Sequence, residues 1–202
     1  MINKAILALA LVGLCVAEMR GAELKEGDII FQTSLSSQSK AIQAATKSKY
    51  SHVGLIVLHE GKLYVFEAIK TTRLTPLETW IKRGENGKYV AKRLKNADTI
   101  LNAQTIAKMK EESKKLEGKN YDLTFNWSDD KIYCSELVWK IYKRGANIEI
   151  GKLQKLGEFD LSDNAVKAKL KERYGDNIPI DETVISPASI FESDLLETVQ
   201  SN

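Results

Sequence analysis

The segment from Val53 to Ala68 constrains the fold most strongly, because it has the pattern of a β-hairpin. Two runs rich in β-branched and aromatic residues, Val53–Leu58 and Leu63–Ala68, flank the polar stretch His59–Lys62. That stretch contains Gly61, and a tight hairpin turn favours glycine because glycine tolerates a positive φ. The pattern therefore predicts two adjacent antiparallel strands, in a sheet that other elements must cover.

The remaining periodic segments predict an α+β fold. Strands are expected over Ile29–Gln32 and Tyr89–Leu94, and helices over Ser36–Thr46, Leu77–Arg83, Thr99–Glu117, the segment after Cys134, residues 162–174 and Ala188–Glu192. Ser186 and Pro187 open the last of these as an N-cap and a first-turn proline. We therefore expect one domain, residues 18–202, with a small antiparallel sheet packed against helices.

The N-terminal residues have the composition of a secretory signal peptide. Lys4 precedes an uncharged apolar run, Ala5–Ala17, that is too short to span a bilayer. We place the cleavage after Ala17, so residues 1–17 are the expected signal peptide and the mature protein is periplasmic or secreted. No stable membrane insertion is expected after its removal. The alternatives are an uncleaved anchor or a buried helix.

Charge and cysteine content narrow the possible functions. The net charge is only +3 and the basic residues are dispersed, which argues against nucleic acid as the partner. Removal of the signal peptide takes away Cys15 and leaves Cys134 as the one thiol, so no internal disulfide is expected. Two histidines and one mature cysteine give no zinc-type spacing, and we expect neither a metal nor a cofactor.

Cys134 is a candidate nucleophile because it stands at the expected start of an amphipathic helix. The partial positive charge and unpaired N–H groups of a helix N-terminus favour a thiolate, and a cysteine pKa of about 8.5 can fall there to roughly 3.5–7.5. The same N–H groups can receive an oxyanion. The alternative is an inert core cysteine, because Cys134 has helical spacing to the apolar Leu137 and Val138.

A base and an orienting group for this thiol can be sought in the hairpin. His59 falls at its turn and is expected in solvent, which leaves His52 as the candidate base. If Glu60 and Gly61 form the turn, Glu67 lies diagonal to His52 on the same face. A register slip of one residue would move Glu67 to the other face, and a solvent-exposed Glu67 is the alternative.

Several other polar residues near these positions have two possible roles. Tyr50 and Tyr133 are near His52 and Cys134, and their hydroxyl groups could donate to a tetrahedral oxyanion, although packing is the alternative for each. Asp129 and Asp130 could cap the helix that follows or face solvent.

An ordered set of short motifs resembles the YiiX/YaeF-like permuted papain-like enzymes, which are related to NlpC-type cell-wall peptidases. The motifs are Gly27-Asp28-Ile29-Ile30-Phe31, Ser37-Gln38-Ser39, Tyr50-Ser51-His52-Val53-Gly54, Phe66-Glu67-Ala68, Gly118-Lys119-Asn120-Tyr121-Asp122, Trp127-Ser128-Asp129-Asp130, Tyr133-Cys134-Ser135-Glu136-Leu137 and Val184-Ile185-Ser186-Pro187. The order of histidine before cysteine is that group's circular permutation of the papain arrangement. The resemblance covers nearly all of the mature chain.

This resemblance implies a circularly permuted papain-like, NlpC-type fold with Cys134 as nucleophile, His52 as base and Glu67 as the third member. It implies a cysteine hydrolase that cleaves an amide through an acyl-enzyme, with a small molecule, a peptide or a cell-wall fragment as substrate. The alternatives are a lipid thioesterase or acyltransferase of the same fold, and an envelope protein that binds a ligand without turnover.

Overall fold

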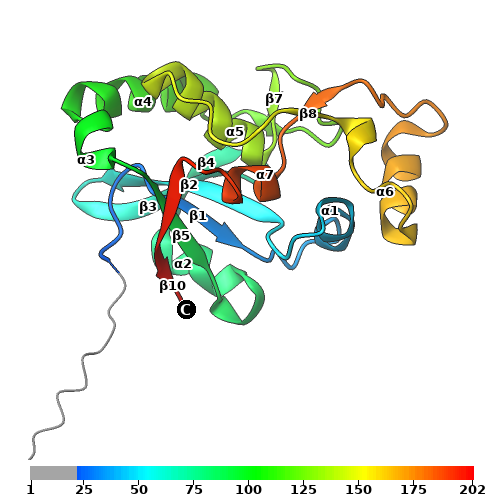
Figure 1. The fold of residues 1–202 in the computed structure, drawn as a ribbon, viewed down its shortest axis with the longest axis horizontal. Coiled ribbons are helices and arrows are strands. Elements are labelled where there is room, and N and C mark those ends of the chain that lie inside the picture. The colour runs from blue at the N-terminus through cyan, green and yellow to red at the C-terminus, as the bar shows by residue number, and fades with distance from the viewer. Residues whose placement is uncertain (1–21) are drawn as a thin grey trace, which may run out of the picture.

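The structure, a computed structural model, describes residues 22–202, and the predicted signal peptide lies outside them. Within this range the main sheet has six strands in the order β10-β5-β1-β2-β3-β4, and every neighbouring pair is antiparallel. Helices lie on both sides of this sheet, and α1 and α6 lie beside each other beyond one end of it (Figure 1). The α+β class and the antiparallel sheet predicted from the sequence are confirmed.

The elements have the following bounds. The strands are β1 Ile29–Gln32, β2 His52–His59, β3 Lys62–Ala68, β4 Thr72–Pro76, β5 Val90–Leu94, β6 Asn120–Tyr121, β7 Lys131–Ile132, β8 Gln154–Lys155, β9 Thr183–Val184 and β10 Leu196–Ser201. The helices are α1 Ser39–Thr46, α2 Leu77–Arg83, α3 Ala97–Ile100, α4 Ala103–Leu116, α5 Cys134–Ile141, α6 Asn164–Tyr174 and α7 Pro187–Phe191, with short 3₁₀ turns at Glu85–Gly87 and Leu156–Glu158 and a π turn at Tyr142–Ala146. In the part of the chain described here, no helix is both long and apolar enough to cross a membrane.

The β2–β3 hairpin has the predicted register. His59 pairs with Lys62, and the turn residues Glu60 and Gly61 both have positive φ, as a two-residue primed turn requires. Two strands of the main sheet, β4 and β10, were not predicted. Neither has a continuous apolar run, because each lies at an edge of the sheet, where alternate side chains face solvent.

Side chains on the two faces of the sheet enter different clusters, as the two-residue period of a strand requires. Ile29 and Phe31 belong to the main core, which α5 covers, whereas Ile30 between them belongs to a second cluster around Trp80 of α2. The central strands are therefore buried on both faces, and the sheet holds α2 and α5 in fixed positions on opposite sides.

The region 97–117 differs from the single helix that the sequence predicted. It consists of α3 and α4, and the Asn102 side chain between them accepts a hydrogen bond from the Thr105 N–H to cap α4. An asparagine favours such a cap over a helix interior, which explains the break. The other predicted helices begin and end within three residues of their observed bounds.

We expect Gly145→Ala to destabilise the fold by about 1–3 kcal/mol, the usual cost of overpacking. A Cβ at this position would lie 2.7 Å from Cα and 2.9 Å from N of Met109, so the backbone of α4 would have to move. Urea unfolding followed by circular dichroism measures the change. Gly61→Asn is the control, because a Cβ at Gly61 meets no atom within 4 Å and asparagine tolerates its positive φ. Equal midpoints for the two variants would contradict the proposed packing.

Candidate active site

Cys134 is the first residue of α5, with Tyr133 as the N-cap. Its side chain is almost fully buried, and the backbone N–H groups of Val53 and Ser135 hydrogen-bond to the sulfur. Burial raises the pKa of the Cys134 thiol, but the hydrogen bond and charge of His52 and these N–H groups outweigh burial, and the pKa lies below its ordinary value. The position at a helix N-terminus that the sequence predicted is confirmed.

His52 begins β2 and lies between the thiol and Glu67. Its Nε2 is 2.6 Å from Oε2 of Glu67, so Nδ1 is the ring nitrogen left for the hydrogen bond to Cys134. Burial lowers the pKa of His52, but its hydrogen bonds and charge interactions with Cys134 and Glu67 raise it to about 9. The lowered pKa of the thiol and the raised pKa of the imidazole both favour the thiolate–imidazolium form of the pair.

Glu67 is fully buried, and its carboxylate accepts three side-chain hydrogen bonds. Oε2 accepts from His52 and from the Arg83 guanidinium, and Oε1 accepts from Thr75 Oγ1 at 2.6 Å. Burial raises the pKa of Glu67, but the interactions with His52, Arg83 and Thr75 outweigh burial and hold the pKa at about 2. The carboxylate is therefore ionised and stabilises positive charge on the imidazole.

Helix α2 contributes two residues that sequence reasoning missed. The Trp80 ring stacks on the His52 imidazole, with centroids 5.9 Å apart, and Arg83 pairs with Glu67. These positions are three residues apart and therefore lie on the same side of the helix. Helix α2 directly follows β3 and β4, and β3 carries Glu67. The spacing of Trp80 and Arg83 on this helix was therefore the sequence signal that could have pointed to them.

Tyr121 at the end of β6 is a third missed residue. Its hydroxyl accepts a hydrogen bond from Gln38 Nε2 at 2.8 Å and hydrogen-bonds to Cys134, and Arg173 in turn donates to the Gln38 carbonyl oxygen. Burial and the negative charge of Cys134 raise the pKa of Tyr121 well above its ordinary value. The phenol thus stays protonated and acts as a donor beside the sulfur.

The structure gives Tyr50 and Tyr133 the packing contacts that the sequence left open as alternatives. The Tyr133 hydroxyl accepts a hydrogen bond from the Ile185 N–H, and the Tyr50 ring packs on Phe191 with centroids 4.2 Å apart. Tyr133 also lines the cavity beside the thiol, whereas Tyr50 does not. His59 is half-exposed at the hairpin turn, as predicted.

A cavity of about 110 Å³ leads away from Cys134 between α1 and α6. Its apolar walls include Ile42, Leu156, Val166 and Leu170, and Gln38 and Arg173 also line it. A concave apolar site with a few convergent polar groups is the usual form of a small-ligand pocket. The Cys134 thiol is therefore buried from bulk solvent yet next to a space that a ligand can enter.

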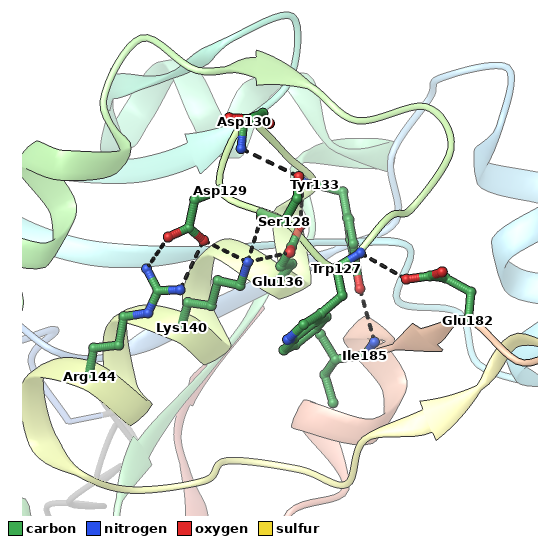
Figure 2. Close-up of polar contacts among 10 residues, drawn as sticks. All are labelled: Trp127, Ser128, Asp129, Asp130, Tyr133, Glu136, Lys140, Arg144, Glu182 and Ile185. Carbon is green, nitrogen blue, oxygen red and sulfur yellow. Dashed lines mark hydrogen bonds and ion pairs between the residues drawn. The ribbon is translucent and has the colours of Figure 1, made fainter.

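The segment leading into α5 is fixed by a charged network (Figure 2). Lys140 pairs with Glu136 at 2.7 Å and with Asp129 at 2.8 Å, and Arg144 forms two hydrogen bonds to the same Asp129. Burial raises the pKa of Glu136 to about 7, against the lowering effect of Lys140. The sequence left two roles open for Asp129, a helix cap or a solvent-facing residue. The structure shows neither role, because the ion pairs of Asp129 join the 127–133 loop to α5.

The fold, with His52 earlier in the chain than the Cys134 that it contacts, is that of a permuted papain-like protein. Residues 23–200 match the family described as "Permuted papain-like amidase enzyme, YaeF/YiiX, C92 family", and the chain belongs to that family. The resemblance drawn from the sequence motifs is therefore confirmed.

Two comparisons identify relatives within this family. The chain is 52% identical over 173 residues to the "Uncharacterized protein YiiX" of Escherichia coli K12, a match that covers 86% of this chain and 84% of the relative. A solved structure titled "Crystal structure of metalloprotein yiiX from Escherichia coli O157:H7, DUF1105" matches with a TM-score of 0.84 and 51% identity, over 88% of this chain and 97% of the other.

That title describes its protein as a metalloprotein, and a metal in this chain would need a set of donor side chains. Among residues 22–202, no three or more His, Cys, Asp or Glu side chains are grouped to hold a metal ion. Cys134 and His52 are two donors of the type zinc uses, fewer than the set that zinc sites take from a protein. The described residues therefore do not fit a bound metal.

We expect Glu67→Gln to shift the pH dependence of Cys134 alkylation upward. The His52 pKa of about 9 lies above the ordinary 6.5, so its imidazolium persists until pH rises through about 9 and keeps the thiol pKa low. Without the carboxylate the imidazolium is weaker, and the pH of half-maximal reaction with iodoacetamide should rise toward about 8.5, the value of a free thiol. Alkylation that is quenched after a fixed time at a series of pH values, followed by mass spectrometry, measures this pH.

Glu60→Gln in the same hairpin is the matched control, because Glu60 is exposed and contacts neither His52 nor Cys134. Its profile should match that of the wild type. Identical profiles for Glu67→Gln and the wild type would show that Glu67 does not orient or charge the imidazole.

Proposed function

We propose that this protein is an exported cysteine hydrolase that cleaves an amide bond through an acyl-enzyme on Cys134. The observation that carries the proposal is the contact between a buried thiol and a His52 imidazole paired with an ionised Glu67, at the edge of an enterable cavity. Membership in a family of amidases supports the reaction type. The apolar run at residues 5–17 supports export to the periplasm or beyond.

The proposed reaction has two steps. The Cys134 thiolate forms a bond to the substrate carbonyl carbon, and the C–N bond breaks as the His52 imidazolium gives its proton to the leaving amine. Neutral His52 then takes a proton from water, whose oxygen forms a bond to the thioester carbonyl carbon. The C–S bond breaks, a carboxylic acid is released, and the Cys134 thiolate and His52 imidazolium are restored. Glu67 remains ionised throughout and holds the imidazole in the orientation that serves both steps.

Tyr121 is placed to stabilise the oxyanion that forms in each step. Its hydroxyl already accepts from Gln38, so its own proton is directed toward the reacting end of the site at Cys134. The N-terminal N–H groups of α5 add positive potential at the same place. Tyr121 is thus a further candidate oxyanion donor beside Tyr50 and Tyr133.

We infer a peptide or a cell-wall fragment as the substrate class, as expected for an exported member of this fold. A second candidate is a lipid thioesterase or acyltransferase that uses the same acyl-enzyme, and the apolar walls of the cavity favour a hydrophobic acyl group. The third candidate is a protein that binds a ligand without turnover. Such a protein would not need the charged groups His52 and Glu67 around Cys134, so their presence counts against it.

We expect Cys134 of the native protein to react with iodoacetamide at neutral pH faster than an unperturbed thiol, because its pKa lies below the ordinary value. Incubation with an envelope extract should leave a covalent adduct on Cys134, detectable by intact-mass spectrometry and absent from Cys134→Ala. Slow, unselective alkylation would count against an activated nucleophile. Ligand retention by Cys134→Ser, with no adduct on the wild type, would favour a binding protein.

We expect Tyr121→Phe to lower kcat by about 10²–10³-fold with little change in KM, the usual effect of losing one oxyanion donor. The rate of alkylation of Cys134 should stay within a few fold, since alkylation forms no oxyanion. Tyr174→Phe is the control, because that hydroxyl donates to the Thr124 carbonyl outside the site. The kcat of both variants can be measured with the amide that the adduct on Cys134 identifies. An unchanged kcat would remove Tyr121 from the mechanism.

A further inference from the structure

Gln38 occupies the N-cap position of α1, where its residue type departs from a local preference. N-cap positions favour Ser, Thr, Asp and Asn, because these short side chains accept hydrogen bonds from the first N–H groups of a helix. The Gln38 side chain makes no such bond. Instead its Nε2 donates to the Tyr121 hydroxyl at 2.8 Å, and its Oε1 accepts from Arg173 of α6. A side chain that leaves its own helix uncapped and joins two distant segments indicates a role outside that helix.

Arg173 determines which way round the Gln38 amide lies. A guanidinium group carries only donors, so the atom of Gln38 that faces it must be the carbonyl oxygen, and the N–H group must face Tyr121. The phenol has a single proton, which does not point toward an N–H donor and is left for Cys134. The direction of each hydrogen bond from α6 to the thiol is therefore set by the charged group at the α6 end.

Packing around α6 keeps the Arg173 guanidinium in this position. Val166 and Leu170 of α6 belong to one buried cluster with Ala41, which lies in the first turn of α1, and the two helices lie beside each other in Figure 1. The guanidinium also lies over the Phe125 ring, 4.7 Å from the ring centroid. The packing of α6 on α1 thus brings the charge to the residue at which α1 begins.

We propose that Arg173 is a positioning residue, which acts through Gln38 to keep the Tyr121 hydroxyl a donor toward the oxyanion formed at Cys134. This inference rests on the proposed acyl-enzyme and makes its oxyanion stabilisation depend on the packing of α6. With the Gln38 amide reversed, the carbonyl oxygen would take the Tyr121 proton. The phenol would then present lone pairs to the developing negative charge, which is repulsive.

The test compares two reactions of the same sulfur. With p-nitrophenyl acetate, the Cys134 thiolate forms a bond to the carbonyl carbon through an oxyanion, the C–O bond breaks, and p-nitrophenolate leaves with the electron pair. With iodoacetamide, the thiolate displaces iodide at a saturated carbon and no oxyanion forms. The ratio of the acylation rate to the alkylation rate therefore reports oxyanion stabilisation and cancels any change in the amount of thiolate. Cys134→Ala gives the background rate.

Gln38→Glu and Gln38→Met separate the direction of the hydrogen bond from packing. The carboxylate keeps its contact with Arg173 but only accepts, so it should take the Tyr121 proton and lower the ratio about 10²–10³-fold, the usual cost of one oxyanion donor. Methionine loses Arg173 but leaves the phenol free to donate, so the ratio should fall only about 2- to 10-fold. A structural role predicts the opposite order, because a carboxylate beside Arg173 at a helix N-terminus favours folding. Gln104→Glu, exposed on α4, is the control for charge and should keep the wild-type ratio.

The role of Arg173 itself is tested with Arg173→Lys and Arg173→Met. Lysine still offers only donors and should keep a ratio near that of the wild type, whereas methionine offers none and should lower the ratio about 2- to 10-fold, the factor of one hydrogen bond. Lys171→Met is the matched control, because Lys171 is exposed in the same turn and pairs with Asp176. Adding Gln38→Glu to Tyr121→Phe should cause no further loss, since both changes remove the same donor.

The possible outcomes separate this inference from the proposed function. A ratio that Gln38→Glu leaves unchanged, or that Gln38→Met lowers more than Gln38→Glu, overturns the positioning role and leaves the activated thiol in place. A further loss in the double variant with Tyr121→Phe shows that the carboxylate acts by its charge, and also overturns it. If Gln38→Glu does not fold, equal ratios for Arg173→Lys and Arg173→Met overturn it. Slow alkylation of the wild type overturns the proposed function itself and this inference with it.

Discussion

The site depends on a carboxylate that has no access to water. Removing an ion such as Glu67 from solvent costs several kcal/mol, so the fold must supply donors to keep it charged. His52, Arg83 and Thr75 supply them from three different elements, β2, α2 and β4. The hairpin register, the position of α2 and the edge strand β4 are therefore linked through one side chain, and each must be correct for the imidazole to be held and charged.

The proposed nucleophile, Cys134, is positioned by a different set of interactions on the other side of the sheet. Helix α5 is buried along its whole length, and the Glu136–Lys140 pair with Asp129 ties it to the loop that precedes Cys134. A buried ion pair contributes little net stability when compared with apolar packing, but it strongly penalises arrangements in which one partner is left alone. We interpret the network in Figure 2 as a device that fixes the start of the helix.

Much of this arrangement could be predicted from the sequence, and the residues show why the rest could not. The His52–Glu67 proximity followed from strand period and turn length, which are local rules, and Cys134 followed from a helix start. Tyr121 could not be found in this way, because β6 has only two residues and is brought to Cys134 by the path of the chain between α4 and α5. Arg83 and Trp80 were assigned to a correctly predicted helix, but their partners depend on which face of the sheet that helix covers.

The same limit applies to the strands β4 and β10, which were missed. A polar edge strand such as Leu196–Ser201 has no periodic apolar signal of its own, and its pairing with β5 is a tertiary contact. The cavity between α1 and α6 was also beyond sequence reasoning, since apolar residues on two helices indicate packing and not the space left between them.

One backbone contact at the sheet edge bears on the permuted order of His52 and Cys134 along the chain. The Ala22 N–H donates to the Val199 carbonyl at 2.9 Å, so the segment that leads into β1 runs next to β10. A short peptide joining these two segments, with new termini opened at the α3–α4 junction near Leu101, would yield a polypeptide in which the cysteine is translated before the histidine. That is the unpermuted papain order, and the thiol, imidazole and carboxylate would keep their neighbours. A change from the permuted to the unpermuted order would thus keep the contacts among these three side chains and move only the positions of the chain termini.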